Sequence, residues 1–450
     1  MKMEDMVLVS LDDHIIEPPD MYERHLTAEQ KKFAPTFHTD KEGINYWLYD
    51  GRRIGGVGLN AVVGRPKVEY GMEPVSLSQM REGCYNVAKR VDDMNVNGVL
   101  ASMCFPTVTM FDGNVFNTFK DKKQALTLLR AYNDWHVDEW CAAAPGRFIP
   151  CCLVPSWDMN ATVDEIKRLA KKGVHSVTFS DNPVNRGYPS IHNEYWEPFW
   201  KVCAENEVVI GMHHGTGNAA PRFSPESPMD AWIVCMGLSI SLALTDYLHL
   251  DALLRYKNLK FALIESGVGW IPYVLERMDF VLQQHGTWTH SNFGGKKASD
   301  IFREHFLCTF VHRDGGFNQE AIALLGAHTI CYESDYPHSD TQWPRGPEAL
   351  WEYIGKLPDK QIDMMTHENA LKAYAFDAFG KLGGRENCTV KALRTKAAHV
   401  DTTEHSKPGF SATAGTGSRG RVTTADVEAF FKRLEEKHAS NDSSGTQAAE

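Results

Sequence analysis

The sequence predicts an α/β fold in which eight parallel strands alternate with helices and close into a distorted (β/α)8 TIM-like barrel, with insertions over its C-terminal face. Eight short apolar or β-branched runs recur along the chain, and segments with helical spacing separate them. The runs are continuously apolar rather than alternating, as expected where helices cover a parallel sheet. An open, doubly wound sheet is the competing architecture.

The expected strands and helices follow from these patterns in chain order. The apolar runs occupy residues 7–14, 97–106, 147–155, 173–180, 207–217, 259–267, 307–316 and 328–338. Amphipathic stretches with a period near 3.6 occupy residues 79–94, 125–144, 160–172 and 193–206. Each of these stretches lies directly before a predicted strand, which is the order of a βα repeat.

Two connections are too long for plain barrel loops and divide the chain further. In residues 20–80, Asp50-Gly51 is a turn signal that predicts a hairpin. Residues 218–251 start rich in proline and continue with helical spacing. Both follow predicted strands, so we expect them to form lids over the C-terminal face of a domain spanning 1–384. Residues 385–422 are expected to be a flexible linker, and 423–450 a partly disordered tail with a short helix at 423–438.

Composition limits the classes of partner. The formal charge is −11, from 58 acidic against 47 basic residues, which gives no basic field for nucleic acid or an anionic membrane. The N-terminus carries acids where a signal peptide needs bases, and we identify no apolar window of about 18 residues, the length of a membrane span. We therefore expect a cytoplasmic protein that acts on a small molecule.

Ionisable residues stand at the ends of three predicted strands. Asp12 and His14 share one face of the first strand, while Asp13 points away and is expected to be structural. A histidine pair, His213 and His214, ends the fifth strand, and Asp335 ends the eighth. In a closed barrel these ends converge, and His and Asp in such a set are typical ligands of a divalent metal. The alternative is that the acids cap loops, where Asp is common.

Glu265 ends the sixth strand within an otherwise apolar run. A buried carboxylate is costly unless it is hydrogen-bonded or lies near a cation, and a raised pKa would suit Glu265 to proton transfer. It could equally bind a neighbouring backbone group or an arginine.

The motifs carrying these residues resemble a known family. The stretches "VSLDDHIIEPPDMYERHL", "MHHGTG", "ESGVGWIPYVLERMD", "ESDYPHSD" and "HENALKAY" occur in the order found in amidohydrolase-related proteins akin to aminocarboxymuconate-semialdehyde decarboxylase. The similarity extends over about residues 6 to 380. It implies a TIM-like barrel with one divalent metal, usually zinc or manganese, and often a homodimer.

By this resemblance the metal ligands are Asp12, His14, His213 and Asp335. His213 is chosen over His214 because the family places one residue between this histidine and the following glycine. Where many members have His-x-His on the first strand, this chain has Asp12-x-His14, so iron or magnesium become credible beside zinc and manganese. The catalytic histidine that related decarboxylases carry on strand six is replaced by Glu265.

The function expected from these residues is hydrolysis of a small aromatic or cyclic substrate by a metal-activated water. Catalysis is assigned to Asp335, Glu265 and His213, with Asp335 accepting the water's proton. Substrate contacts are expected from His214, Trp270, His338 and Arg52. Nonoxidative decarboxylation of an aromatic or unsaturated acid is the first alternative, and a non-catalytic metal- or ligand-binding barrel the second.

Overall fold

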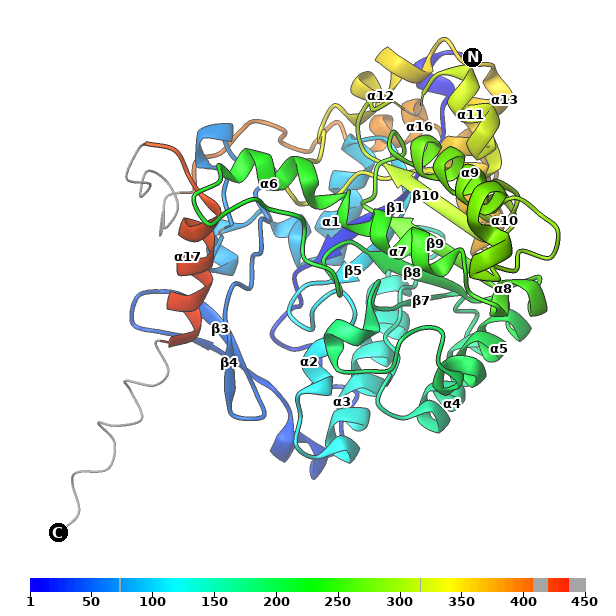
Figure 1. Cartoon of the computed structure of the whole chain (residues 1–450). Helices are drawn as coiled ribbons and strands as arrows, with labels where there is room; N and C mark the ends of the chain where they lie inside the picture. Colours follow the sequence, from blue (N-terminus) through cyan, green and yellow to red (C-terminus); the bar gives the residue numbers. More distant parts are fainter. Residues whose placement is uncertain (73, 316, 408–419, 437–450) are drawn as a thin grey trace.

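The computed structural model describes residues 1–72, 74–315, 317–407 and 420–436. Eight of its strands run parallel, and each overlaps one of the apolar runs identified in the sequence. They are β1 (Leu8–Ile15), β5 (Val99–Pro106), β6 (Phe148–Ile149), β7 (Ser176–Thr178), β8 (Val209–His213), β9 (Lys260–Ile264), β10 (Phe306–Phe310) and β11 (Ile330–Tyr332). They run through the middle of the molecule with helices around them (Figure 1).

These strands form two sheets that meet at both edges. One sheet has the order β1-β5-β6 and the other β11-β10-β9-β8-β7. Single parallel bridges join them, Cys152 with Val177 at one seam and Asp13 with Tyr336 at the other. The eight strands therefore follow one another around a ring in chain order. The barrel is distorted because each of the two seams between the sheets is held by only one bridge among the described residues.

Both faces of the strands are buried, which explains their continuous apolar sequence. Along β1 and the two residues before it, Val7, Val9 and Leu11 belong to one apolar cluster, while Met6 and Leu8 belong to the other. A strand that is covered by side chains on one face and by helices on the other has no face in contact with solvent, so its sequence does not alternate with polar residues.

The helices between and around the strands start at side-chain caps in several cases. Asn86, Asp121, Asp158 and Asn318 each accept a hydrogen bond from a backbone N–H in the first turn of a helix.

The α-helices of the described residues are α1 (Val87–Val96), α2 (Asn114–Asn117), α3 (Lys122–Trp135), α4 (Met159–Ala170), α5 (Glu197–Glu205), α6 (Met229–Met236), α7 (Ser239–Tyr247), α8 (Ala252–Arg255), α9 (Ile271–Thr289), α10 (Ala298–His305), α11 (Gln319–Leu325), α12 (Gly346–Ile354), α13 (Asp359–Asp363), α14 (Asn369–Ala373), α15 (Ala378–Leu382), α16 (Val390–Lys396) and α17 (Thr424–Glu436).

The first insertion, residues 20–80, contains a small antiparallel sheet. Strands β2 (Thr36–Thr39), β3 (Asn45–Tyr49) and β4 (Arg52–Ile54) pair in that order. Asp50 and Gly51 turn between β3 and β4 with φ of 49° and 71°, the left-handed values that a two-residue hairpin turn requires. The predicted hairpin is present and has one additional strand.

The second insertion, residues 218–251, contains α6 and α7. The segment Met229–Tyr247 is 19 residues long with a mean hydropathy of 1.3, so by length and composition alone it is apolar enough to cross a membrane. The expectation that the chain has no apolar window of about 18 residues is therefore wrong for this segment, in which serines and a threonine interrupt the apolar residues but leave the mean hydropathy high. Only 22% of it is buried inside the molecule.

The C-terminal part of the chain contains more structure than its composition suggests. Within the stretch expected to be a linker, α16 packs Val390 and Leu393 into the core. Helix α17 lies within the range 423–438 where a short helix was expected. The part of the expected linker at 408–419 and the end of the expected tail at 437–450 lie outside the described residues.

Candidate metal centre

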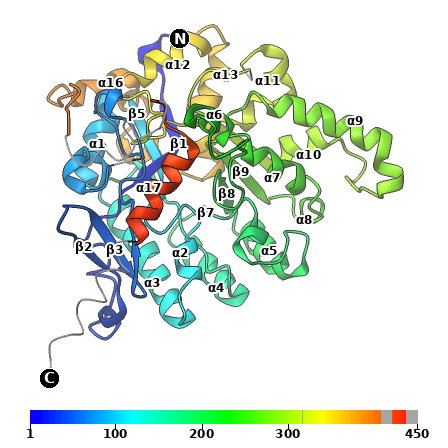
Figure 2. The same ribbon diagram turned by 60° about the vertical axis from the view of Figure 1, so that its left-hand side comes forward.

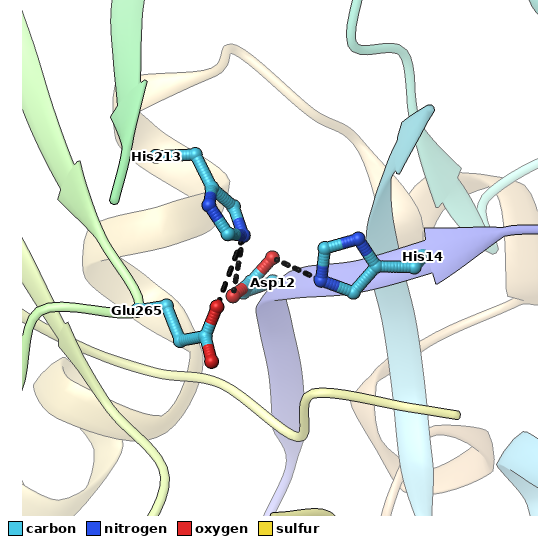
Figure 3. A group of neighbouring side chains, drawn as sticks. All are labelled: Asp12, His14, His213 and Glu265. Carbon is cyan, nitrogen blue, oxygen red and sulfur yellow. Dashed lines mark ion pairs between the residues drawn. The ribbon is translucent and has the colours of Figure 1, made fainter. Parts of the chain in front are cut away.

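The first two side chains of the site come from an irregular end of β1. Ser10 pairs with Ser102 and Asp13 with Cys104, so three steps along β1 match two along β5. Such a bulge bends a strand and re-aims its side chains. Asp12 Oδ1 and His14 Nε2 then lie 3.6 Å apart, with both side chains fully buried (Figure 3).

His213, the last residue of β8, faces this pair from across the barrel. Its Nε2 lies 3.5 Å from Asp12 Oδ2 and 3.1 Å from Glu265 Oε2. Its Nδ1 lies 2.7 Å from the carbonyl oxygen of His214, which can only accept a hydrogen bond. Nδ1 therefore carries the proton, and the lone pair of Nε2 points toward the carboxylates, which is the tautomer that a metal-binding imidazole needs.

Asp335 and Glu265 follow the ends of β11 and β9 in the same unusual backbone conformation. Each has a φ of 52°, in the left-handed region that residues other than glycine rarely adopt. Strain of this kind persists where the surroundings hold a residue in place, and it is concentrated at functional sites. Asp335 N donates to Asp12 O at 2.8 Å, and Asp335 Oδ1 lies 3.4 Å from His14 Nε2.

The donor set fits a single divalent cation. Six buried atoms of this set have no hydrogen-bond partner among the residues that the structure describes: Asp12 Oδ1 and Oδ2, His14 Nδ1 and Nε2, His213 Nε2 and Asp335 Oδ1. Leaving one buried polar atom unsatisfied costs about 1–3 kcal/mol, so a native site rarely collects several without a ligand. Asp12, His14, His213 and Glu265 offer atoms within 4.8 Å of one another, as do His14, Asp335 and His338. Two imidazoles with carboxylates suit zinc or manganese.

The electrostatics of the cluster agree with this donor set. Burial, and next the negative charge of Glu265, raise the pKa of Asp12 and of Asp335 well above the usual value. Burial also lowers the pKa of His14, so its imidazole is neutral and able to donate a lone pair. Acids crowded into a buried site in this way are stabilised as carboxylates by a cation.

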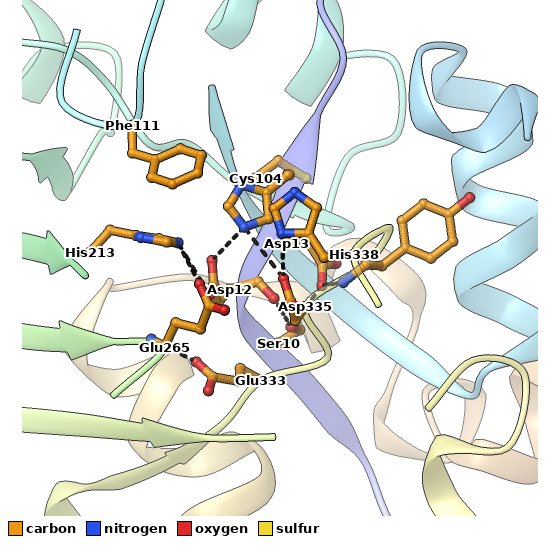
Figure 4. A network of polar contacts seen from close by, with 12 residues as sticks. Ser10, Asp12, Asp13, Cys104, Phe111, His213, Glu265, Glu333, Asp335 and His338 are labelled. Carbon is orange, nitrogen blue, oxygen red and sulfur yellow. Dashed lines mark hydrogen bonds and ion pairs between the residues drawn. The ribbon is translucent and has the colours of Figure 1, made fainter. Parts of the chain in front are cut away.

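Two of the four predicted substrate-binding residues, His338 and His214, lie at the cluster, and Figure 4 shows His338 beside Asp335. The His338 ring stacks on His14 with centroids 3.9 Å apart, and its Nδ1 lies 3.0 Å from Asp335 Oδ1. His214 Nε2 lies 2.7 Å from Glu265 Oε2. Burial alone would lower the pKa of His214, but Glu265 outweighs it and raises that pKa.

The other two predicted residues make different contacts. Trp270, which precedes α9, donates from its indole Nε1 to Ser266 O at 2.7 Å. Arg52 lies on β4 and donates to Thr118 Oγ1. Neither contact involves one of the candidate ligands.

Three residues that the sequence did not point to support the site. Phe111, in the loop after β5, lies against His213 and His14 with centroid distances of 4.2 and 4.9 Å. Arg90 on α1 is fully buried and donates to His14 O at 2.5 Å. Glu333 accepts a hydrogen bond from Glu265 N at 3.1 Å. A phenylalanine in a loop or an arginine in a helix carries no local signal of such a role.

The chain belongs to the amidohydrolase family, whose model matches residues 44–376. This match begins after β1, so the placement of Asp12 and His14 rests on the geometry of the site. A comparison with curated proteins finds no match.

Solved structures with the same fold include an amidohydrolase and two decarboxylases. The amidohydrolase from Mycobacterium avium subsp. paratuberculosis has a TM-score of 0.62 at 16% identity, over 82% of this chain and 99% of that one. The 5-carboxyvanillate decarboxylase from Sphingomonas paucimobilis has a TM-score of 0.56 at 17% identity, with coverages of 82% and 99%. The 5-carboxyvanillate decarboxylase from Novosphingobium aromaticivorans, solved with bound manganese and 3-methoxy-4-hydroxy-5-nitrobenzoic acid, has a TM-score of 0.56 at 17% identity, with coverages of 83% and 99%.

Proposed function

We propose that this protein is a mononuclear metal-dependent enzyme in which Asp12, His14 and His213 hold the ion and Asp335 transfers a proton. One observation carries the proposal: buried atoms that have no hydrogen-bond partner among the described residues gather around His14. His14 Nε2 lies 3.6 Å from Asp12 Oδ1 and 3.4 Å from Asp335 Oδ1, and Asp12 Oδ2 lies 3.5 Å from His213 Nε2. Glu265 stands close enough to His213 to serve either as a further ligand or as a second proton-transfer group. When bound, the ion supplies Lewis-acid polarisation of a substrate oxygen and neutralises the clustered carboxylates.

The ion we propose is zinc or manganese. Asp12 and Glu265 make the donor set richer in oxygen than a purely imidazole site, which favours a harder ion such as manganese, while zinc accepts the same mixed set. The manganese bound by the Novosphingobium decarboxylase supports manganese for a barrel of this fold.

The reaction we propose first is nonoxidative decarboxylation of an aromatic or unsaturated carboxylic acid. The bond between the carboxyl group and the ring carbon breaks, its electron pair stays on that carbon, and carbon dioxide leaves. The carbon then takes a proton, which we assign to Asp335 because its Oδ1 lies inside the cluster, 3.0 Å from His338 Nδ1 and 3.4 Å from His14 Nε2. The likeness to 5-carboxyvanillate decarboxylases over more than four fifths of the chain supports this choice.

Hydrolysis is the second candidate, favoured by membership of the amidohydrolase family. In this reaction Asp335 accepts a proton from the attacking water and passes it to the leaving group, so the same carboxyl group acts first as a base. His338, stacked on His14, then holds Asp335 in place for both transfers.

A single assay separates the two reactions. Purified protein loaded with zinc or manganese is incubated in D2O with a panel of hydroxybenzoic acids, and in parallel with aromatic amides and esters. Decarboxylation releases carbon dioxide and leaves one deuterium on the product carbon, whereas hydrolysis releases an amine or alcohol without it. The Asp335→Asn variant should lose turnover while retaining metal. Full activity of that variant would refute the role given to Asp335.

A further inference from the structure

Helix α17 lies between the two insertions of the barrel. In both ribbon views it stands beside the β3–β4 hairpin of the first insertion and close to α6 of the second (Figures 1 and 2). The match to the amidohydrolase family ends at residue 376, so α17 is an addition to the barrel.

The contact of α17 with the first insertion is apolar. Phe430 and Leu434 are buried and form a small cluster with Ile44 and Val75. At the end of β4 the backbone approaches the helix so closely that a Cβ on Gly55 would lie 3.0 Å from Leu434 Cβ. A glycine is needed here because any side chain would push the helix away.

The contact of α17 with the second insertion is a ladder of hydrogen bonds. Met229 N, at the start of α6, donates to Val422 O at 2.9 Å. Thr424 N donates to Ser227 O at 3.1 Å, and Thr424 Oγ1 donates to Ser224 O at 3.1 Å. Thr423 and Pro228 form an antiparallel bridge next to these bonds.

Helix α6 has little packing of its own. None of its residues is buried, and Val234 is 77% exposed. At its other end, Gly237 lies against the loop after β9, where a Cβ would be 2.8 Å from Ser266 O and 3.5 Å from Glu265 O. The position of α6 therefore depends on its two ends, one held by α17 and the other resting on the backbone of Glu265.

The first insertion also reaches the site. Asn60 Oδ1 accepts a hydrogen bond from Ser339 N at 2.6 Å, and Val63 N donates to Pro337 O at 3.0 Å. These two bonds hold the residues on either side of His338, so each insertion contacts a loop that carries a residue of the candidate metal centre.

We propose that α17 is a strap that joins the two insertions over the C-terminal face, and that its release lets them separate so that substrate reaches the buried cluster. Asp12, His14 and His213 are fully buried while α17 is docked. Local opening of a weakly packed element is the ordinary way to expose such a site, and it takes less free energy than global unfolding. This role in substrate access rests on the proposed function, whereas the mechanical link between α17 and α6 does not.

The test compares two full-length variants that place the same charge at a buried and at an exposed position of α17. Phe430→Asp puts a carboxylate into the apolar contact, and Ala429→Asp puts it on the exposed face. Amide hydrogen exchange is measured for both and for the wild type, without added metal. In Phe430→Asp we expect at least about tenfold faster exchange in α6 and in β3–β4 as well as in α17, since each 1.4 kcal/mol lost from closure is a factor of ten. Ala429→Asp should match the wild type.

A milder variant and a second readout protect the test against misfolding. Leu434→Ala shortens one side chain of the same contact and should change exchange in the same elements by a smaller factor. In metal-loaded protein, both contact variants should lose the ion to a chelator faster than Ala429→Asp. If Phe430→Asp speeds amide exchange in α17 alone and leaves exchange in α6 unchanged, the proposal that α17 acts as a strap would be wrong. If Phe430→Asp speeds exchange in α6 and in β3–β4 as expected, but the protein binds no metal, the result would count against the proposed function and not against the strap.

Discussion

His213 Nδ1 donates its hydrogen to the carbonyl oxygen of His214 at 2.7 Å, which leaves His213 Nε2 unprotonated and directed at Asp12 and Glu265. The neighbouring ring of His214 instead pairs with Glu265 through its own Nε2. Two adjacent histidines therefore have different tasks, one facing the cluster and one supporting it from outside.

This difference predicts opposite outcomes for two matched substitutions. His213→Ala removes a proposed ligand and should reduce bound metal to near zero after dialysis, measured by inductively coupled plasma mass spectrometry. His214→Ala removes only a partner of Glu265, so metal should remain, with an affinity lower by at most about 10–100-fold. Equal metal content in the two variants would show that His213 is not the ligand.

The contacts of Asp13 predict that this residue stabilises the fold without binding the metal directly. Its carboxylate accepts hydrogen bonds from Tyr336 N at 3.0 Å and from the hydroxyls of Ser10 and Ser102. Burial raises its pKa to about 6, although the positive charge of Arg90 acts to lower that pKa. Asp13→Ala leaves these buried donors without their acceptor, and we expect a loss of about 3 kcal/mol in the free energy of unfolding by urea.

The matched control for Asp13 is Asp92→Ala. Asp92 is half-buried and lies 3.8 Å from Lys89 Nζ and 3.6 Å from the ring of the exposed His399. Pairs of this kind contribute about 0–1 kcal/mol. A change in stability as small for Asp13→Ala as for this control would mean that Asp13 does not join β1 to the β11 loop.

Glu17 predicts a pH dependence of stability. Its carboxyl group is buried, accepts hydrogen bonds from Thr107 N and Val108 N at 3.0 Å each, and has its pKa raised by burial from 4.5 to about 7. Between these two values the unfolded chain releases the proton while the folded chain keeps it, so stability falls as the pH rises through this window. Above pH 7 the accumulated loss is about 3 kcal/mol.

The measurement for Glu17 is urea unfolding at pH 5 and pH 8 for the wild type and Glu17→Gln. A neutral amide cannot titrate, so the variant should lose less stability than the wild type over this interval. Parallel losses in the two proteins would show that Glu17 ionises equally in the folded and unfolded states.

Gly237 predicts a local effect on the site. Gly237→Ala would place a Cβ 2.8 Å from Ser266 O and so displace the loop that carries Glu265. We expect at least about a tenfold fall in kcat/KM, which corresponds to about 1.4 kcal/mol. Gly286→Ala on α9 meets no atom within 4 Å and is the control, with unchanged kcat/KM and equal or greater stability. Equal activities would show that the α6–α7 junction does not position Glu265.

The order of the strands could be predicted because parallel strands buried on both faces leave continuous apolar runs, as in Val7–Leu11. The bulge at Leu11 and Asp12 could not, since a register shift depends on the partner strand and leaves no local pattern. The docking of α17 could not be predicted from the sequence either. Phe430 and Leu434 show that one face of the helix is apolar, but the surface that covers it lies almost four hundred residues earlier.

For the site, the convergence of strand ends in a barrel predicts Asp12, His14, His213 and Asp335 as one cluster. The structure groups Asp12, His14 and His213 with Glu265, and Asp335 with His14 and His338. It could not place Phe111, whose contact with the two imidazoles depends on the path of a loop. The expectation that Arg52 reaches the substrate came from its position in the first insertion, and the structure gives Arg52 a hydrogen bond to Thr118. Long side chains on insertions are the hardest to assign, because their direction is set by tertiary packing.

The most direct test of the metal centre is the metal content of the purified protein and of His14→Ala. The wild type should contain about one zinc or manganese ion per chain. His14→Ala should contain almost none while keeping the circular dichroism spectrum of the folded protein. A wild-type protein that is folded and fully active without bound metal, or a His14→Ala variant that retains its ion, would contradict the account of this site.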